Sequence, residues 1–427
     1  MSEGQASAVE HLFRHQAGRM LSALTRVLGV HNLDLAEDAV QDTLCRALET
    51  WKFGRLPDDP EAWLIRAARN RAVDLIRRER TARRFAPDVT YLLETEWTLE
   101  RTVDALFTEH EVRDDQLRLM FSCCAPELAP EAQIAVILKL LCGFGVAEIA
   151  QAFLTQPATI EKRLTRAKAT LAAQKQLFEV TGGEALRERL GAVHSALYLL
   201  FNEGYHATAG AGAVRDELCR EAIRLTALLA DHPATGVSST WALLALMCLH
   251  GARLPARLDG EGRLLIMAEQ DRGRWDQALI ARGDEALARA AAAADAEEGS
   301  SPFQLEAAIA AVHAFAPSYA DTDWRKIVAL YDALHRLRPS PVVGLSRAIA
   351  IGEAFGPAEG LRALETIAER ERLDSQPFVH VARAQALRGL QRFEEARAAL
   401  RQARGVARTD AERTFIDGQL AACHPSQ

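Results

Sequence analysis

The sequence predicts an all-α fold on three observations. Alanine and leucine dominate the composition, and both residues favour helices. Aromatic residues make up only 6% of the 427 residues. Apolar residues recur at helical spacing through most of the chain, and glycine or proline interrupts that pattern, as at Gly29 and in residues 52–60. The length and the 49% hydrophobic content leave room for two to four domains with buried cores.

Charge and cysteine content indicate where DNA could bind and whether the cysteines form disulfides. The formal net charge of −7 is not that of a nucleic-acid binder taken whole, so the local distribution of charge decides whether DNA can bind. The seven cysteines form no C-x-x-C pair. We expect most of them to pack as small apolar residues, although the neighbouring Cys123 and Cys124 could instead sense redox state. No signal peptide opens the chain and no apolar run reaches the ~18 residues of a membrane span, which favours a cytoplasmic protein without a membrane partner.

The first predicted domain covers residues 8–84 and begins with two amphipathic helices. The first helix spans residues 8–30 and ends around Gly29. The second spans about residues 34–51, and its apolar stripe includes Leu35, Val40 and Leu44. The outer face of this second helix carries acidic and amide side chains: Glu37, Asp38, Gln41 and Asp42.

A loop and an arginine-dense helix complete this domain. The helix is predicted over about residues 61–84 and carries arginines at positions 66, 69, 71, 77, 78, 80, 83 and 84. Forked guanidinium donors suit phosphate, so this face is a candidate DNA surface; an ordinary solvated face is the alternative. At the loop, aromatic and basic residues alternate: Trp51, Lys52, Phe53 and Arg55. Such a group suits a base that has left the stack, unless Trp51 and Phe53 are core anchors.

An acidic linker over residues 85–111 separates the first domain from a second, over residues 112–176. The second domain contains a helix-turn-helix pattern, with one helix over residues 146–154 and another that starts at Pro157. In the second helix the inward positions are Ile160, Leu164, Ala167 and Leu171. The outward positions are Thr159, Lys162, Arg163, Arg166 and Lys168. Such a helix enters the major groove by its N-terminal part; a helical hairpin with basic solvent-facing residues is the alternative.

The third predicted unit, residues 184–423, contains a repeat. Residues 346–364 align with residues 382–400 at an offset of 36, which is typical of tetratricopeptide-like repeats and predicts an α-solenoid. Two segments in this unit are candidate regulatory sites, namely Asn202, Glu203 and Tyr205, and Asp271, Arg272, Arg274, Trp275 and Asp276. Each is either a ligand or partner site or part of a buried salt-bridge network that fixes the solenoid against the second domain. We find no metal-ligand spacing, phosphate loop or nucleophile elbow, and expect neither a cofactor nor an enzyme.

Taken together, these segments resemble the extracytoplasmic-function sigma factors, which are bacterial transcription initiation factors. Residues 36–44 match the family's helix for docking on the polymerase clamp, residues 62–78 its −10 segment, and residues 144–172 its −35 helix-turn-helix. The resemblance covers about the first 176 residues. Residues 121–132, 201–205, 270–276 and 322–324 look like the long members that carry a C-terminal tetratricopeptide extension in place of a separate anti-sigma protein.

The resemblance implies a role for each candidate residue. Glu37, Asp38, Gln41 and Asp42 would contact the clamp coiled-coil of the largest polymerase subunit. The first domain, residues 8–84, would be the family's region 2, and the second, residues 112–176, its region 4, which would meet the polymerase flap region. The −10 element would be handled by Arg66, Asn70, Arg71, Asp74, Arg77 and Arg78, and the 52–60 loop would receive a flipped base. The −35 element would be read by Thr159, Lys162, Arg163, Arg166 and Lys168. The linker would thread near the active-site channel, and the extension would pack back on the DNA-binding domains.

The sequence leaves one competing interpretation open. A stand-alone helix-turn-helix regulator, with a solenoid that senses a ligand or a peptide, would share the DNA-binding helices. Only the pattern at residues 36–44 separates the two, because a stand-alone regulator needs no docking helix for polymerase. If the extension regulates the sigma domains, deletion after about residue 180 is expected to change activity.

Overall fold

The computed structural model describes residues 3–53, 57–82, 107–153, 155–174, 176–180, 184–205, 216–260, 264–294, 301–407 and 410–423. In these ranges the regular structure is helical, and an isolated bridge between Leu258 and Leu264 is the only β pairing. The predicted all-α fold is therefore confirmed. The chain divides into two compact units, residues 1–199 and 200–427, with the boundary inside helix α10 (Glu184–Tyr205). None of the described helices is both long and apolar enough to cross a membrane.

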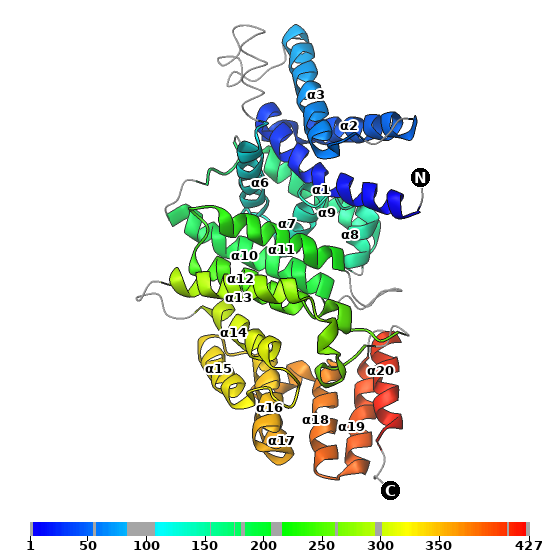
Figure 1. The fold of residues 1–427 in the computed structure, drawn as a ribbon, viewed down its shortest axis with the longest axis vertical. Coiled ribbons are helices and arrows are strands. Elements are labelled where there is room, and N and C mark those ends of the chain that lie inside the picture. Colours follow the sequence, from blue (N-terminus) through cyan, green and yellow to red (C-terminus); the bar gives the residue numbers. More distant parts are fainter. Residues whose placement is uncertain are drawn as a thin grey trace. The chain divides into compact units, whose positions relative to one another are not determined.

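The first unit begins with three helices that pack on one another: α1 (Glu3–Leu28), α2 (Leu33–Phe53) and α3 (Pro60–Ala82). Figure 1 draws them in blue. The chain turns sharply at Gly29, whose φ of 88° lies in the region that glycine adopts without strain. A short 3₁₀ turn, Val30–Asn32, then leads into α2. The core includes Met20, Leu24, Leu64 and Ile76, which are at most 1% exposed.

Four more helices follow: α6 (Glu109–Cys123), α7 (Pro130–Leu140), α8 (Val146–Ala152) and α9 (Pro157–Ala172). The predicted turn of the helix-turn-helix is present between α8 and α9. The inward positions predicted for α9 are all buried: Ile160, Leu164, Ala167 and Leu171. Pro157 occupies the first turn of α9, where its missing N–H costs no hydrogen bond. Most of the predicted acidic linker, residues 83–106, lies outside the described residues.

The two groups of helices in this unit pack tightly on each other. Helix α1 contacts both α6 and α7. The approach is so close at Gly18 that an added Cβ would lie 2.0 Å from the carbonyl oxygen of Leu141. Since no side chain fits at that distance, Gly18 is a contact point between α1 and the turn that follows α7.

The second unit consists of successive helices, drawn from green to red in Figure 1. They are α11 (Asp216–Asp231), α12 (Ser238–Gly251), α13 (Gln277–Ala292), α14 (Pro302–Phe315), α15 (Trp324–Leu337), α16 (Pro341–Phe355), α17 (Pro357–Glu365), α18 (Pro377–Gly389), α19 (Phe393–Val406) and α20 (Asp410–Ala421). From α14 to α20 each helix packs on the next. Proline opens α14, α16, α17 and α18, which is its favoured place in a helix.

The repeat at an offset of 36 residues corresponds to two helix pairs, α16–α17 and α18–α19. In the first pair the helices cross at two glycines, since a Cβ on Gly360 would lie 2.7 Å from the Cα of Gly352. The position that matches Gly360 in the second pair is Ala396, which is fully buried. A small residue at this crossing lets the two backbones approach, which explains why the repeat is visible in the sequence.

Candidate nucleic-acid interface

The four predicted polymerase contacts on the outer face of α2 differ in their exposure and in their ion-pair partners. Asp38, Gln41 and Asp42 are exposed, whereas Glu37 is half-buried. The carboxylate of Asp42 accepts a hydrogen bond of 2.5 Å from the guanidinium of Arg71 on α3. Glu37 is paired with Lys168 of α9. Two of these four side chains thus already hold a cation, and Asp38 and Gln41 form the open part of the face.

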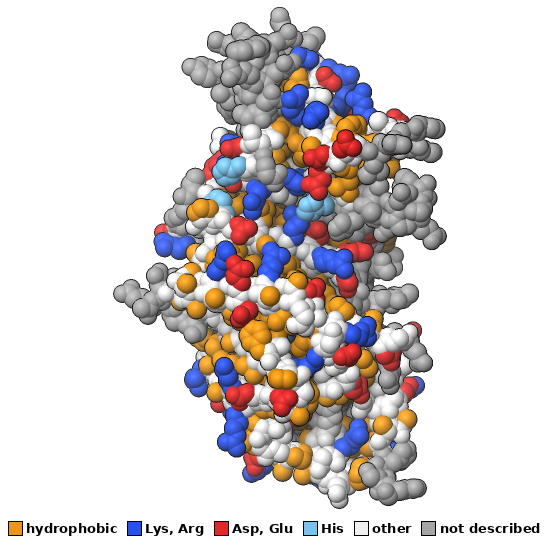
Figure 2. Space-filling view, in the orientation of Figure 1, with side chains coloured by type: hydrophobic (Ala, Val, Ile, Leu, Met, Phe, Trp, Pro, Cys, Tyr) orange, Lys and Arg blue, Asp and Glu red, His pale blue; other side chains and the backbone are white. Residues whose placement is uncertain are grey.

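Helix α3 presents the predicted −10 residues. Arg66, Asn70, Asp74, Arg77 and Arg78 are exposed, and Arg71 is half-buried by its bond to Asp42. Asn70 is not free, because its side-chain oxygen accepts a 2.8 Å hydrogen bond from its neighbour Arg69. Figure 2 shows Lys and Arg side chains gathered where Figure 1 draws α3. An exposed row of guanidinium groups on one helix is suited to a phosphate backbone.

Trp51 is a core residue in this structure. Its side chain is 7% exposed, and its ring packs 5.4 Å from that of Phe13 and 5.5 Å from that of Trp63, centroid to centroid. A base cannot stack on a ring whose faces are already covered, so the predicted role of Trp51 in receiving a base is wrong for this conformation and the core-anchor alternative describes it. The side chains of Lys52 and Phe53, together with Arg55, lie outside the described residues.

Helix α9 exposes Thr159, Lys162 and Arg166, as predicted for a helix that reads the major groove. Arg163 is half-buried, and its guanidinium carbon lies 5.6 Å from the ring centroid of Phe153. Lys168 differs from the prediction. Its ammonium group contacts the carboxylate of Glu37 and lies 3.4 Å from that of Asp34, both on α2. Lys168 is therefore engaged with a protein surface, not available for DNA, in this conformation.

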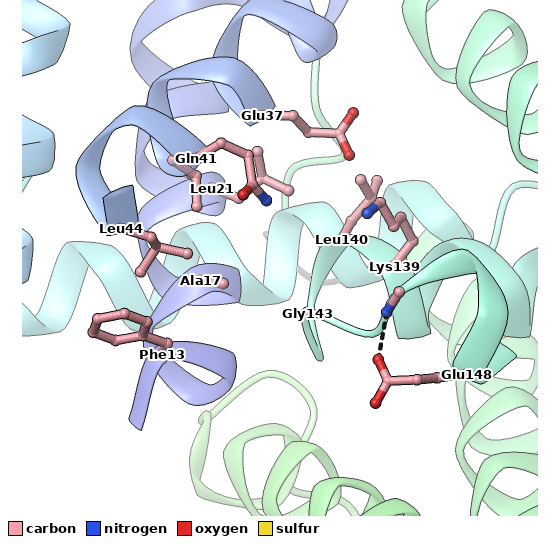
Figure 3. A pocket seen from close by; sticks show the side chains of 12 residues that line it. Phe13, Ala17, Leu21, Glu37, Gln41, Leu44, Lys139, Leu140, Gly143 and Glu148 are labelled. Carbon is pink, nitrogen blue, oxygen red and sulfur yellow. Dashed lines mark hydrogen bonds between the residues drawn. The ribbon is translucent and has the colours of Figure 1, made fainter. Parts of the chain in front are cut away.

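A cavity of about 330 Å³ lies beside this ion pair, between α1, α2 and α7. Figure 3 shows Phe13, Leu21 and Leu44 on one side of it and Lys139 and Glu148 on the other. Glu148 accepts a hydrogen bond of 2.7 Å from the backbone N–H of Gly145, which fixes the start of α8. Sequence reasoning missed this cavity because its walls come from segments that are far apart in the chain.

Sequence reasoning also missed a charge cluster between α1 and α6. Asp115 is fully buried, bonds the guanidinium of Arg118 at 2.6 Å and lies 4.0 Å from that of Arg26. Burial raises the pKa of Asp115 to about 6, against the opposing effect of the two arginines. Both arginines also contact Glu179, at 3.1 and 3.2 Å. No local pattern could reveal this cluster, since Arg26 and Glu179 are 153 residues apart.

The neighbouring cysteines fit the core-packing interpretation. Cys123 and Cys124 are at most 1% exposed. Burial raises the pKa of the Cys124 thiol to about 12 and that of the Cys123 thiol well above its ordinary value. Because the thiolate is the reactive form, both groups are poorly suited to redox sensing.

The segment that contains Asp271 and Asp276 joins two helices of the second unit. Asp276 caps the N-terminus of α13, and Asp271 caps a 3₁₀ turn, Arg272–Arg274. The guanidinium of Arg272 donates to the carbonyl oxygens of His313, at 2.5 Å, and Ala316, at 2.6 Å, at the C-terminal end of α14. Among the described residues no ion pair joins this segment to another, so helix capping, and not the alternative of a salt-bridge network, describes these contacts.

Aromatic and basic groups pack around this segment. Trp275 is 3% exposed, and the guanidinium carbons of Arg272 and Arg253 lie 4.7 and 5.7 Å from its ring centroid. Arg274, by contrast, is exposed. Burial and the positive charges of Arg253 and Arg272 lower the pKa of His313 to about 4, so this imidazole is neutral near pH 7.

The other candidate regulatory segment is also partly built into the fold. Tyr205 stacks on Phe201 at 5.6 Å between ring centroids, and the guanidinium of Arg257 lies over the ring of Tyr205 and donates to its carbonyl oxygen. Asn202 and Glu203 are half-buried. Burial raises the pKa of Glu203.

Comparison with known proteins places these helices in a family. Residues 12–82 match sigma-70 region 2, and residues 118–171 match sigma-70 region 4. The chain is a sigma factor of the sigma-70 family. Residues 189–291 of the sigma factor match a family of unknown function, DUF6596. An uncharacterized protein from Rhizobium meliloti (strain 1021) is 40% identical over 407 residues, which is 94% of each chain. No solved structure matches the chain significantly.

The matched segments agree with the helices described above. Region 2 covers α1, α2 and α3, and region 4 covers the helix-turn-helix of α8 and α9. These two regions support a role in transcription initiation, in which a sigma factor binds core RNA polymerase and promoter DNA. The match to a family of unknown function begins inside α10 and ends in α13.

Proposed function

We propose that this sigma factor belongs to the extracytoplasmic-function class, and that its C-terminal tetratricopeptide-like unit modulates its own sigma regions. The observation that carries most weight is the division of charge between adjacent helices. Helix α2 exposes Asp38 and Gln41, α3 exposes a row of arginines, and α9 exposes Lys162 and Arg166. The acidic face would contact polymerase, and the basic helices beside it would contact two promoter elements. This arrangement suits a protein that acts only when bound to core RNA polymerase.

The energetics of DNA binding also favour a sigma factor that contacts DNA while bound to polymerase. Extrusion of one base from the stack costs a few kcal/mol, which a small region 2 supplies only in part. When polymerase fixes both regions at a set separation, the second DNA contact becomes intramolecular and gains from a high effective concentration. The acidic face of α2 is therefore proposed to contact the clamp coiled-coil. The exposed α3 residues are proposed to contact the −10 element, and Thr159, Lys162 and Arg166 the −35 element.

A charge reversal on α2 tests the docking face. We expect Asp38→Lys to lower affinity for core polymerase and to reduce run-off transcription by at least tenfold. Glu49→Lys is the matched control, because Glu49 is exposed on the same helix three turns away. Binding is measured by pull-down with purified core enzyme. Equal affinity for the two variants, together with tight duplex binding in the absence of polymerase, would favour the stand-alone regulator instead.

A truncation tests the modulation. We expect a chain that ends after residue 199, the boundary of the first compact unit, to differ from the full chain in transcription with core polymerase. Unchanged run-off activity from the same promoter would contradict the proposed role of the extension.

A further inference from the structure

Regions 2 and 4 are packed together in a way that transcription initiation does not permit. At 3.4 Å per base pair, two promoter elements about 25 base pairs apart are separated by roughly 85 Å. In the structure α1 touches α6 and α7, with Gly18 against Leu141, and α9 is joined to α2 through Lys168 and Glu37. Two regions in direct contact cannot reach both elements at once. The packed arrangement must therefore open before the two regions engage a promoter.

The chain immediately beyond region 4 contacts both regions at their interface. The two carboxylate oxygens of Glu179 accept separate hydrogen bonds, at 3.1 Å from Arg26 on α1 and at 3.2 Å from Arg118 on α6. One carboxylate thus bridges region 2 and region 4. Arg26 and Arg118 both also face the buried Asp115, and Arg118 lies 3.9 Å from Glu111, but of these carboxylates Glu179 is the one that accepts hydrogen bonds from both guanidinium groups.

Neighbouring residues hold Glu179 in place. The ring of Phe178 stacks on that of Phe121 in α6, with 5.4 Å between centroids and 12° between planes. The backbone N–H of Phe178 donates to the hydroxyl of Ser122 at 2.9 Å. From helix α10 the guanidinium of Arg189 lies 4.6 Å from the ring centroid of Phe178. Leu177 is also buried. The segment is therefore anchored on α6 and covered by the first helix of the extension.

We propose that Leu177, Phe178 and Glu179, together with Arg189 of α10, form an intramolecular clasp, in which Glu179 holds region 2 closed against region 4 and Phe178 couples that closure to helix α10. The clasp gives the extension a route to the sigma regions, because α10 begins in the first compact unit and continues into the second. Movement of α10 would withdraw Arg189 and Phe178 and release the carboxylate from Arg26. This inference rests on the proposed modulation of the sigma regions by the extension. It identifies the contact between Arg189 of α10 and Phe178 as the route of that modulation.

A distance measurement on the full-length chain tests the clasp without polymerase. Cys45 on α2 is the exposed cysteine of the described residues, so it takes one spin label, and Glu161→Cys on exposed α9 takes the other. In this labelled background we expect Glu179→Lys to shift the distance distribution toward longer separations, because a lysine repels Arg26 and Arg118. Glu188→Lys is the matched control, since Glu188 is exposed on α10 and undergoes the same change of charge.

Polymerase binding supplies the second measurement. We expect Glu179→Lys to raise affinity for core polymerase about tenfold, because the closed form no longer competes with binding, while Glu188→Lys leaves it unchanged. Phe178→Ala is expected to act in the same direction, and thermal unfolding checks that each variant is folded. A distance distribution for Glu179→Lys that matches the control would overturn the clasp. A longer distance without a gain in affinity would keep the clasp and contradict its link to polymerase.

Discussion

Replacing Arg272 by methionine should destabilise the second unit, because this guanidinium closes the end of α14. Methionine keeps an unbranched apolar stem against Trp275 and removes only the charged donors. The last carbonyl groups of a helix have no partner within the helix, and Arg272 supplies two of them with hydrogen bonds, at His313 and Ala316. The change therefore separates a capping role from general packing.

The expected loss follows from these contacts. A hydrogen bond to a charged group contributes about 1.5–3 kcal/mol, and water replaces part of it at this half-exposed site. The contact with the ring of Trp275 adds roughly 0.5–1 kcal/mol. We therefore expect the free energy of unfolding to fall by about 2–4 kcal/mol, which lowers Tm by roughly 5–15 °C for a unit of this size.

Thermal unfolding of the full-length protein, followed by circular dichroism, measures this loss. Arg274→Met is the matched control, since Arg274 is exposed in the same segment and its guanidinium reaches a carbonyl only at 3.4 Å. We expect the control to change Tm by no more than about 2 °C. If both variants melted like the parent while Arg272→Met lost transcription, the capping argument would be refuted, and the segment would be a ligand or partner surface.

Three further predictions follow from other parts of the molecule. Lys162→Ala should weaken binding to a −35 duplex and lower the slope of log affinity against log salt concentration by about one, as measured by fluorescence anisotropy. An equal effect of Lys168→Ala on the closed protein would contradict the structure. Gly360→Ala should cost about 1–3 kcal/mol of unfolding free energy in urea, because its Cβ has no room, whereas Gly405→Ala, with open space around it, should cost nothing. Burial lowers the pKa of His194 from 6.5 to about 4, so the neutral imidazole contributes up to about 3 kcal/mol above pH 6.5, and this is lost as pH falls toward 4. His194→Leu should flatten urea stability between pH 7.5 and 5, and an unchanged slope would disprove the assignment.

Packing within the first unit explains why several predicted contact residues are already engaged. Glu37 and Lys168 were assigned to polymerase and DNA, yet they satisfy each other. Asp42 and Arg71 do the same between α2 and α3. Side chains of opposite charge that bind separate partners can pair with each other when those partners are absent. This pairing requires that the helices that carry them lie close together. The pair of Lys168 with Glu37 is half-buried and joins region 4 to region 2, so it competes with the external partners and makes opening dependent on them.

The sequence by itself determined the helices and their faces. Apolar spacing, the turn before Pro157 and the glycine at position 29 are local signals, and local geometry follows from them. The buried positions of α9 and the helix pairs of the repeat are where the sequence predicted them. The family matches to regions 2 and 4 cover the segments that carry the turn at Gly29 and the turn before Pro157.

Tertiary structure alone decided which side chains meet. The contact of Lys168 with Glu37 spans 131 residues and that of Glu179 with Arg26 spans 153, so no spacing rule could anticipate either. Trp51 could be a core residue or a DNA contact until its neighbours Phe13 and Trp63 were known. A side chain's periodicity fixes the face on which it lies, but only packing determines what covers that face.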